Sequence, residues 1–446
     1  MYPRYEHYQD SGVAWLGDVP SHWEVKRLKF LITELRVGPF GSAIKISDYA
    51  ESENLLYNQR TVLDNNFFEN VISITDEKYV ELCSFQVYAG DFLITTRGTI
   101  GKVAIVPKNA SKGIIHPCLI RFRIDESRIF PRLLKIIFNE TAFFQDQLKL
   151  KSNATTIDVI YSNSLKELIL LLPPLPEQTA IAAFLDCKLV QIDALISKQE
   201  TLLAKLAEKR TALITHAVTR GLNPAAPLKP SGVAWLGEVP QHWEVKRLRF
   251  VLEVNPVKSE LNLPDETTVS FIPMDAVNFD KNLTLTQEKS LDEVYKGYTF
   301  FRDNDVLLAK ITPCFENGKS AIAQNLTNGI GFGTTELHVL RANGQFNNHF
   351  LYYLLKTDLF MKLGESQMYG AGGQKRISEE FIKNFSLGIP PLAEQTAIAH
   401  YLDTQTAQID ALSNKIRQTI ARLQEYRRTL ITQAVTGKIK VIGEHR

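Results

Sequence analysis

The sequence has few residues of the kinds that build metal sites and disulfide frameworks. Only four of its 446 residues are cysteine. They show no Cys-x-x-Cys spacing and no histidines at the spacing of metal ligands, so the pattern argues against zinc and predicts reduced thiols. The four are Cys83, Cys118, Cys187 and Cys314. We therefore expect no metal in this chain.

Long apolar runs are also missing. No stretch reaches the roughly 18 apolar residues of a membrane span, and the first residues lack the regions of a signal peptide. We expect a cytoplasmic protein without membrane contact.

Hydrophobic residues still make up 44% of the chain, which suffices for globular cores, and the length favours about three domains. The net charge of +2 neither indicates nor excludes a nucleic-acid partner, because acidic faces can offset a basic surface.

Catalytic signatures are absent as well. The chain has no Gly-x-x-x-x-Gly-Lys-Ser/Thr phosphate loop, which argues against an NTP-driven motor. It also lacks the Gly-rich cofactor turn and the Asn/Asp-Pro-Pro-aromatic loop that a methyltransferase of adenine needs. The prolines at 173–174 and 390–391 follow leucine and isoleucine, and we interpret them as the beginnings of helices. We assign no catalytic residue and expect that the chain is not itself an enzyme.

What the sequence does contain is a long segment that occurs twice. Residues 173–219 match residues 390–436 at 27 of 47 positions after a shift of 217. Internal repetition defines the architecture before any motif does. Acidic residues near the start of each copy and a glycine after its last apolar residue are typical of helix ends. Each copy is therefore predicted to form one helix.

Apolar residues recur every seven positions through most of both copies, which is the period of a coiled coil. A helix of about 42 residues is roughly 60 Å long. Either stripe alone could be the core-facing side of an ordinary helix. Neither half of the chain has an obvious surface that would cover its own stripe. We therefore predict that the two helices cover each other's stripe, as an antiparallel pair related by a pseudo-two-fold axis. The repeating residues are Leu185, Ile192, Leu206 and Leu213 in the first copy, and Leu402, Ile409, Ile416, Leu423 and Leu430 in the second.

A second repeat contains all four tryptophans. Residues 11–30 and 231–250, here called the frame segments, agree at 17 of 20 positions. Their tryptophans either pack against the molecule itself or contact a partner protein. The second frame segment follows the first long helix after a proline-rich linker. Pseudo-symmetry therefore predicts that residues 11–23 pack near the end of the second helix, around Val435, and that the two termini lie close together.

The remaining regions are predicted to be two mixed α/β domains: residues 31–170, the first domain, and residues 251–387, the second domain. They share a layout but few residues. Nearly identical frame segments indicate the same contact made twice, whereas diverged domains indicate two different ligands. Predicted strands are 91–96, 102–106 and 119–124 in the first domain and 305–310, 319–323 and 337–341 in the second, with helices at 131–150 and 348–363.

Basic and amide side chains in the loops of the two domains are the candidate ligand contacts. They suit phosphate contact or bidentate recognition of base edges, although any one of them could be an ordinary solvated charge. The candidates are Lys45, Arg60, Arg97 and Lys102 in the first domain, and Lys310, Lys319, Gln374, Lys375 and Arg376 in the second.

Together these features resemble the specificity subunit of a Type I restriction-modification system, over nearly the whole chain. The resemblance rests on the Trp-Leu-Gly-x-Val-Pro-x-His-Trp-Glu-Val-Lys-Arg-Leu segments at 15–28 and 235–248, on Pro-Pro-Leu-x-Glu-Gln at 173–178 and 390–395, and on Thr-Pro-Cys-Phe-Glu-Asn-Gly-Lys at 312–319. It implies a mixed α+β fold with two target recognition domains. Each domain would read one half of a split, asymmetric site in double-stranded DNA, and the helices would set the half-site distance.

The resemblance also implies partners. Two modification (methyltransferase) subunits carrying S-adenosylmethionine would bind the duplicated frame, and restriction subunits (translocase and nuclease) with ATP and Mg²⁺ would join them; the chain itself would hold no cofactor. Candidate partner contacts are Trp15, Trp23, Glu177, Gln178, Trp235, Trp243, Glu394 and Gln395.

The expected division of the chain is 1–172 for the N-terminal segment and first recognition domain and 173–222 for the first helix. Residues 223–389 would form the linker and second recognition domain, and 390–446 the second helix and tail. Two alternatives remain open at this point. The chain could be the recognition subunit of a modification-only or Type II-like fused system, or a coiled-coil adaptor with no DNA role.

Overall fold

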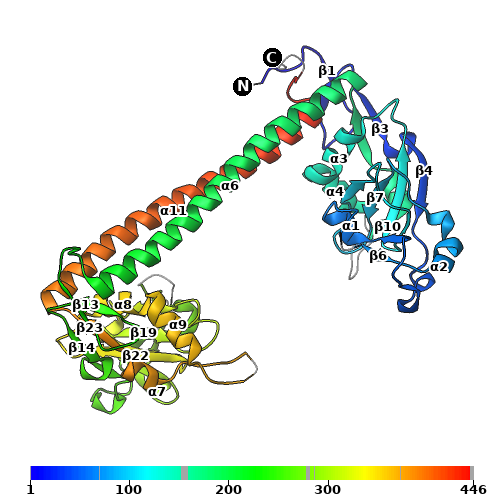
Figure 1. The fold of residues 1–446 in the computed structure, drawn as a ribbon. Coiled ribbons are helices and arrows are strands. Elements are labelled where there is room, and N and C mark those ends of the chain that lie inside the picture. Colours follow the sequence, from blue (N-terminus) through cyan, green and yellow to red (C-terminus); the bar gives the residue numbers. More distant parts are fainter. Residues whose placement is uncertain are drawn as a thin grey trace. The chain divides into compact units, whose positions relative to one another are not determined.

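The computed structural model describes residues 2–69, 71–151, 159–277, 282–285, 287–371 and 373–441. The chain divides into two compact units. The first unit comprises Met1–Gln199 and Gln418–Arg446, and the second comprises Glu200–Arg417. Each unit therefore contains one mixed domain together with half of each long helix (Figure 1). None of the helices in the described part of the chain is both long and apolar enough to cross a membrane.

The two long helices form where the sequence predicts them. Helix α6 spans Leu175–Arg220 and helix α11 spans Leu392–Val435. Each has a glutamate in its first turn, where the carboxylate interacts favourably with the helix dipole. Each is followed by a glycine with positive φ, 76° at Gly221 and 69° at Gly437. Glycine adopts this conformation without steric cost, so it ends a helix readily.

Within each unit, α6 and α11 lie side by side (Figure 1). In the first unit Ile192 of α6 and Leu430 of α11 belong to one hydrophobic cluster. In the second unit Ile214 of α6 and Leu402 of α11 share another. The helices run antiparallel and bury each other's apolar stripe, which confirms the prediction of an antiparallel coiled-coil pair.

The same ion pair crosses the helices in both units. Arg427 of α11 bonds Asp193 of α6 with an Nε–Oδ1 distance of 2.8 Å, and Arg210 of α6 lies 3.4 Å from Asp410 of α11. Arg210 and Arg427 are equivalent under the repeat, as are Asp193 and Asp410. The internal repeat is therefore visible in individual contacts as well as in the sequence.

The first domain is built on an antiparallel sheet of order β4-β10-β7-β8 and a smaller sheet of order β6-β5-β9. Its central strands β7 and β10 are almost fully buried. The sequence of β7 is mostly apolar, whereas β10 carries Arg121 and Arg123, which pair with the buried Asp91. The strands are β4 (Ile32–Val37), β5 (Leu55–Tyr57), β6 (Ile72–Ser73), β7 (Phe92–Thr95), β8 (Val103–Ile105), β9 (Gly113–Ile115) and β10 (Leu119–Ile124). The helices are α1 (Gln59–Leu63), α2 (Asp76–Glu81), α3 (Pro131–Glu140), α4 (Ala142–Lys151) and α5 (Ser162–Lys166).

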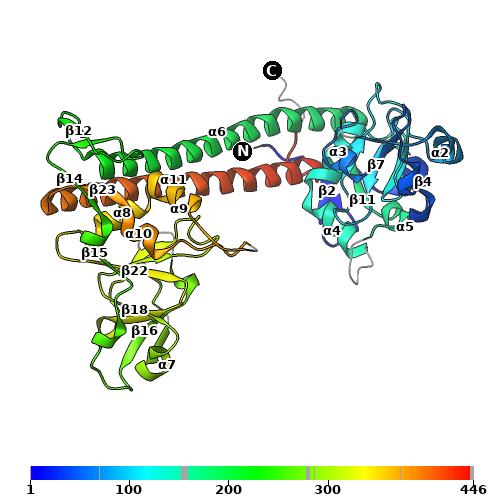
Figure 2. The ribbon, with the colours of Figure 1, turned by 60° about the horizontal axis from the view of Figure 1, so that its bottom comes forward.

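The second domain repeats this plan with sheets of order β15-β22-β19-β20 and β17-β16-β21-β18. Figure 2 shows α8 and α10 between the long helices and β22, with β16 and β18 farther away. The strands are β15 (Leu252–Val254), β16 (Thr268–Ile272), β17 (Gln287–Ser290), β18 (Thr299–Arg302), β19 (Val306–Ala309), β20 (Ser320–Ile322), β21 (Ile330–Gly333) and β22 (Leu337–Ala342). The helices are α7 (Leu291–Tyr295), α8 (Asn348–Leu355), α9 (Asp358–Ser366) and α10 (Glu379–Asn384).

All six strands predicted in the two domains are present, but neither predicted domain helix is continuous. The helix expected at 131–150 is divided into α3 and α4 at Thr141, whose backbone is extended with φ −103° and ψ 129°. The helix expected at 348–363 is divided into α8 and α9 at Thr357. The Thr357 hydroxyl accepts from the amide of Phe360 and so begins a new helix. Both predictions of single helices were wrong because the apolar pattern continues across a break that local hydrogen bonds create.

Each frame segment joins its domain to the strand that leads into a long helix. In the first unit β1 (Tyr8–Asp10) pairs with β2 (Asp18–Pro20), and β3 (Glu24–Arg27) pairs with β11 (Ile169–Leu172). In the second unit β12 (Leu228–Pro230) pairs with β13 (Glu238–Pro240), and β14 (Glu244–Arg247) pairs with β23 (Ser386–Ile389). All these pairs are antiparallel.

The N-terminal and C-terminal segments of the first unit meet as predicted. Trp23 and Val435 belong to the same hydrophobic cluster. The hydroxyl of Tyr8 donates to the carbonyl of Gly437 at 2.9 Å, and the amide of Lys440 donates to the carbonyl of Pro3 at 2.7 Å. The prediction that residues 11–23 pack around Val435 is confirmed, and the described segments nearest the two ends meet at Pro3 and Lys440.

Candidate nucleic-acid interface

The predicted contact residues of the first domain lie in different environments. Arg97 lies two residues after the end of β7 and is exposed. Arg60, on α1, lies 3.2 Å from Asp64, and Lys45 is exposed where a short 3-10 helix begins. The Nζ of Lys102 donates to the carbonyl of Asn139 at 2.7 Å. Lys102 is therefore used within the domain, whereas Arg97 is free to meet a ligand at the end of a central strand.

In the second domain, Lys310 and Lys319 lie at opposite ends of one loop. Lys310 follows β19, and hydrogen bonds on both sides fix its backbone: its amide donates to the carbonyl of Glu336 at 3.0 Å, and its carbonyl accepts from the amide of Ile377 at 2.9 Å. The Nζ of Lys319 donates to the carbonyl of Met274 at 3.1 Å. Lys310, like Arg97, thus lies close to the end of a central strand, and Lys319 resembles Lys102 in bonding a carbonyl of its own domain.

Gln374 and Lys375 are exposed in a loop that Tyr369 and Arg376 close through two backbone hydrogen bonds of 3.1 and 2.8 Å. This loop is fastened to Thr312, whose amide donates to the carbonyl of Lys375 at 3.0 Å and whose hydroxyl accepts from the amide of Lys375 at 3.1 Å. The fold therefore brings Lys375 next to the segment that follows Lys310, although 65 residues separate the two positions in the sequence.

Arg376 has a different environment from its neighbour Lys375. Its guanidinium makes two hydrogen bonds to Glu336, Nε to Oε2 and Nη2 to Oε1, both at 2.9 Å. The hydrogen bonding lowers the pKa of Glu336 and raises that of Arg376. Arg376 therefore positions the loop, and direct DNA contact by this side chain stays a prediction.

A buried aspartate precedes the central strand of each domain, and sequence analysis missed both. Asp91 accepts from Arg121 and Arg123 at 3.0 Å each. Asp305 accepts two hydrogen bonds of 2.8 Å from Arg341, which raise the pKa of that guanidinium. A buried carboxylate needs such partners. The available signal was an aspartate directly before an apolar strand in both domains.

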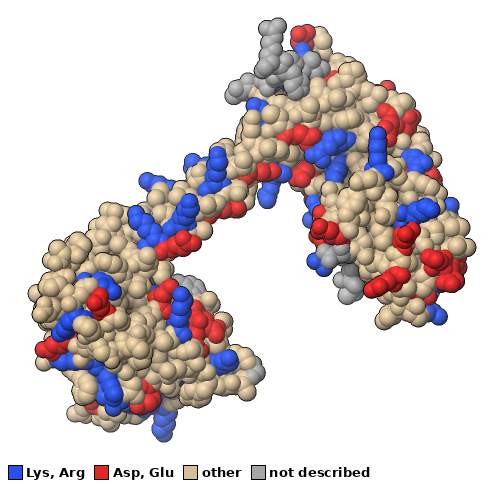
Figure 3. Space-filling view, in the orientation of Figure 1, with Lys and Arg blue, Asp and Glu red and all other residues tan. Residues whose placement is uncertain are grey.

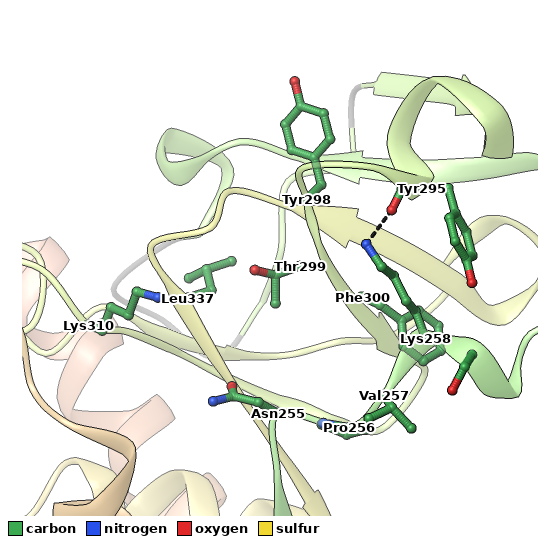
Figure 4. A pocket seen from close by; sticks show the side chains of 11 residues that line it. Asn255, Pro256, Val257, Lys258, Tyr295, Tyr298, Thr299, Phe300, Lys310 and Leu337 are labelled. Atoms are coloured by element: carbon green, nitrogen blue, oxygen red, sulfur yellow. Dashed lines mark hydrogen bonds between the residues drawn. The ribbon is translucent and has the colours of Figure 1, made fainter.

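A cleft of about 500 Å³ opens in the second domain beside Lys310. Figure 4 shows Thr299 near its centre, with Lys310 and Lys258 approaching from opposite sides. The Nζ of Lys258 donates to the carbonyl of Tyr295, 5.1 Å from the centroid of that ring. Within the described residues, the Nζ of Lys310 makes no hydrogen bond or ion pair. Lys310 is thus the available cation in this cleft.

The glutamate and glutamine that begin α6 were predicted to bind a partner, but they are used within the first unit. Glu177 is 3% exposed and accepts from Tyr5, from Trp23 Nε1 at 3.1 Å and from His22 at 2.9 Å. Gln178 is fully buried, and its Oε1 accepts from the amide of Phe130 at 2.7 Å. Partner contact by Glu177, Gln178 and Trp23 stays a prediction, and in this structure the three side chains are buried. Glu177 anchors the frame segment to the helix through His22 and Trp23, whereas Gln178 bonds the start of α3.

The second unit repeats this arrangement with fewer contacts. Gln395 is fully buried, and its Oε1 accepts from the amide of Asn347 at 2.8 Å. Glu394 bonds His242 at 2.7 Å and has a side chain that is 29% exposed. Trp243 is completely buried. Partner contact by Gln395 and Trp243 also stays a prediction for two buried side chains, and Glu394 stays a candidate.

The other two tryptophans differ from these. Trp15 is 48% exposed and Trp235 is 45% exposed. They occupy the same position in the two frame segments. The ring of Trp15 also stacks on Phe143, with centroids 5.7 Å apart, so one face is fixed while the rest meets solvent. Both tryptophans stay candidates for partner contact.

Charged side chains of both signs are interspersed on the face shown in Figure 3, over both domains and along the long helices. This distribution agrees with the small net charge of the chain. On this face, contact with a polyanion would have to be made by selected cations, because no uniformly basic area is visible there.

Two similar mixed domains, each with exposed cations in its loops and a nearly identical frame segment, define an internally duplicated recognition protein. The chain belongs to the family described as "Type I restriction modification DNA specificity domain", whose model matches residues 20–205 and 240–422. These two matches include both domains and most of both long helices.

Individual relatives agree with this assignment. The Type I restriction enzyme EcoAI specificity subunit of Escherichia coli is 36% identical over 247 residues, and the EcoEI subunit of the same species is 34% identical over 246. Each match covers 55% of this chain and 41% of the relative, so the chain spans about two fifths of these relatives. The MjaVIII specificity subunit of Methanocaldococcus jannaschii is 23% identical over 431 residues, covering 95% of this chain and 94% of that protein.

Solved structures show the same fold. A chain from a structure on complex assembly and conformational transition of the type I R-M system superimposes with a TM-score of 0.70, at 19% identity, over 94% of this chain and 98% of the other. The HsdS subunit from Thermoanaerobacter tengcongensis gives a TM-score of 0.55 at 18% identity, with the same coverage.

Proposed function

We propose that this chain is the DNA-recognition subunit of a Type I restriction-modification complex, and that each domain reads one half of a split, asymmetric target in double-stranded DNA. One observation carries the proposal. Two copies of a DNA specificity domain occur in one chain, with frame segments identical at 17 of 20 positions and loops that have diverged. Nearly identical frame segments are expected to make the same contact with a partner twice. Loops that differ between the domains are expected to recognise two different base sequences. The alternative of an adaptor without a DNA role gains no support from the relatives.

The duplicated frame is proposed to bind two modification subunits, with restriction subunits joining the assembly. Trp15 and Trp235 support this part of the proposal, because an exposed aromatic residue repeated at one position suits a contact made twice. We further propose that α6 and α11 set the distance between the half-sites. Their lengths of 46 and 44 residues correspond to roughly 65–70 Å of helix.

Chemistry in such a complex is proposed to reside in the partners. S-adenosylmethionine would be held by the modification subunits, and ATP and Mg²⁺ by the restriction subunits. The sequence of this chain supports the division, since it has neither a phosphate loop nor a methyltransferase motif. The purified chain is accordingly expected neither to methylate nor to cut DNA. Methyl transfer by the isolated chain would contradict this part of the proposal.

The test is to express the chain with its modification subunit in a host that lacks DNA methylation and to sequence the modified bases. We expect one bipartite motif with an unspecified spacer. Exchanging residues 31–170 for the same region of a relative should change one half of the motif and leave the other half and the spacer unchanged. A motif without two halves, or an exchange that alters both halves, would refute the proposal.

A further inference from the structure

The two domains can be aligned residue by residue through their hydrogen bonds, although few residues are identical. Thr96 in the first domain and Lys310 in the second each follow the central strand. The amide of Thr96 donates to the carbonyl of Cys118 at 3.0 Å, and the amide of Lys310 donates to that of Glu336 at the same distance. Each carbonyl then accepts from an isoleucine amide, at 3.0 Å from Ile160 and 2.9 Å from Ile377. Thr96 and Lys310 are therefore structural equivalents.

Two further positions align in the same way. Leu35 pairs with Phe122, opposite the central strand at Phe92, and Val254 pairs with Leu340, opposite Val306. The next residues, Arg36 and Asn255, are therefore equivalent at the end of the edge strand. The amides of Tyr88 and Arg302 each donate to the buried aspartate at 2.8 Å. Tyr88 and Arg302 are therefore equivalent, and so are the residues three positions before them, Phe85 and Thr299.

These three positions line a cleft in both domains. In the first domain a cleft of about 610 Å³ is lined by Arg36, Phe85 and Thr96, among others. In the second domain the cleft of about 500 Å³ is lined by their equivalents, Asn255, Thr299 and Lys310. None of the three pairs is conserved in type. The fold thus keeps a concave surface at one place in both domains and changes the chemical groups inside it.

The cleft of the first domain combines guanidinium groups, each of which presents several N–H donors in one plane, with exposed apolar side chains. Arg36 and Arg97 both line it and are exposed, and neither guanidinium has a hydrogen bond or ion pair within the described residues. At the rim, Phe40 is 90%, Tyr161 55% and Val37 46% exposed. Guanidinium forks suit the O6 and N7 atoms of guanine, and apolar groups suit the methyl group of thymine.

The cleft of the second domain offers different chemistry. Asn255 is occupied in shaping it: the side chain donates to Glu379 at 2.8 Å and accepts from the amide of Val339 at 3.0 Å, with a φ of 55°. Lys258 is held by the carbonyl of Tyr295. Lys310 supplies the available ammonium, with Thr299 beside it (Figure 4). This cleft therefore offers the ammonium of Lys310 where the first offers the guanidinium groups of Arg36 and Arg97.

We infer that these equivalent clefts are the surfaces that select base pairs, with Arg36 and Arg97 discriminating bases in one half-site and Lys310 in the other. The inference rests on the proposed function and names the residues that carry it out. It explains why the frame segments are nearly identical while the cleft linings differ. The two domains share one type of frame segment, whereas their different cleft linings recognise two different base sequences.

The test uses the full chain assembled with its modification subunits and a library of randomised double-stranded DNA, from which bound molecules are sequenced. Lys310→Ala should reduce the preference at one or two adjacent base pairs of one half-site by roughly ten-fold or more, with the other half-site unchanged. Arg97→Ala should do the same in the other half-site. Lys362→Ala removes an exposed cation of the second domain that lies outside the cleft and bonds Asp358, and it should change neither.

Three results would overturn the inference: an unchanged consensus, loss of preference in both half-sites from one substitution, or uniformly weaker binding with the same consensus. The last would assign these cations to phosphate contact. Arg97→Lys and Lys310→Arg keep the charge and guard against misfolding, and both should alter base preference while retaining affinity. If the complex that contains the native chain, without any substitution, selects no DNA sequence, the proposed function itself fails. This outcome can be distinguished from the failure of the inference, in which the native complex does select a sequence.

Discussion

The indole nitrogen of Trp23 donates to Oε1 of Glu177 at 3.1 Å. The equivalent nitrogen of Trp243 is buried without a hydrogen-bond partner in the described part of the chain. The difference begins at Tyr5, which bonds Glu177 in the first unit, whereas Ala225 stands at the corresponding position of the second repeat. Two frame segments of nearly identical sequence are therefore attached to their helices with unequal strength.

Replacing the two glutamates should measure this inequality. In Glu177→Gln the buried side chain loses its charge, and its hydrogen bonds with Tyr5, Trp23 and His22 weaken or break. Hydrogen bonds to charged groups contribute about 1.5–3 kcal/mol, so the free energy of unfolding should fall by about 2 kcal/mol or more. The matched Glu394→Gln should cost less than about 1 kcal/mol. Tryptophan fluorescence during denaturation reports both, and equal losses would contradict the structural difference.

Lys375 and Arg376 are adjacent but should respond differently to substitution. If Lys375 meets a phosphate in the assembled complex, Lys375→Ala should lower the slope of log affinity against log salt by about one unit. Arg376→Ala should instead mainly lower thermal stability, because it leaves Glu336 without its bidentate partner. Binding titrations at several salt concentrations, together with thermal melts, separate the two effects. An unchanged slope for Lys375→Ala would remove this residue from the interface.

The second domain should lose stability in mild acid through His338. This side chain is 5% exposed, and burial lowers its pKa despite a hydrogen bond of 3.0 Å with the carbonyl of Ile377. The unfolded chain therefore takes up the proton more readily below about pH 6.5. The contribution of neutral His338 to stability is complete above that pH and declines as the pH falls below it.

Thermal melts of the native chain and of His338→Gln at pH 7.5 and 5.5 check this expectation. Glutamine can donate and accept at similar positions, so the variant should lose less stability between the two pH values than the native chain loses. His7→Gln, at an exposed position, is the control. Its loss of thermal stability between pH 7.5 and 5.5 should equal that of the native chain. Equal acid sensitivity of the native chain and His338→Gln would exclude His338 as its source.

The proposed role of the helices in setting the half-site distance can be tested by inserting four residues after Lys198 in α6. Residues i and i+4 share a helix face, so the apolar stripe is nearly preserved. The insertion adds roughly 6 Å of rise and about 40° of rotation. Rise corresponds to nearly two base pairs and rotation to about one. The unspecified spacer of the target should lengthen by one base pair, or at most two.

Sequencing of modified bases in cells that carry the insertion variant reports the spacer directly. Both half-site sequences should stay the same. The same four residues inserted between Asn223 and Pro224, in the linker outside the helix, serve as the control and should leave the spacer unaltered. An unaltered spacer in the α6 variant would show that the helices do not set the distance.

The heptad pattern and the internal repeat were sufficient to predict the long helices, their antiparallel pairing and the packing of the N-terminal segment near Val435. Each of these depends on periodicity or on duplication, and both properties are written along the chain. The strands of the two domains were predictable for a similar reason, because short segments rich in β-branched and aromatic residues next to turn residues, such as 91–96, are typical of strands.

Other features required the fold. Trp23 and Trp243 were candidates both for internal packing and for partner contact, and Glu177 and Gln178 were candidates for partner contact. The structure buries all four side chains. Nothing local shows that Tyr5, 172 residues before Glu177, supplies a donor to it. The breaks at Thr141 and Thr357 were missed because the apolar pattern continues across them.

The sequence by itself thus determined the duplicated architecture, since repetition and hydrophobic period are properties of residue order. Only the tertiary structure decided which cations are available. It bonded Lys102, Lys319 and Arg376 to acceptors within their own domains and left Arg36, Arg97 and Lys310 unbonded among the described residues, lining two equivalent clefts. The physical reason is that a side chain's availability depends on acceptors that distant strands bring to it, and those distances are set by the fold.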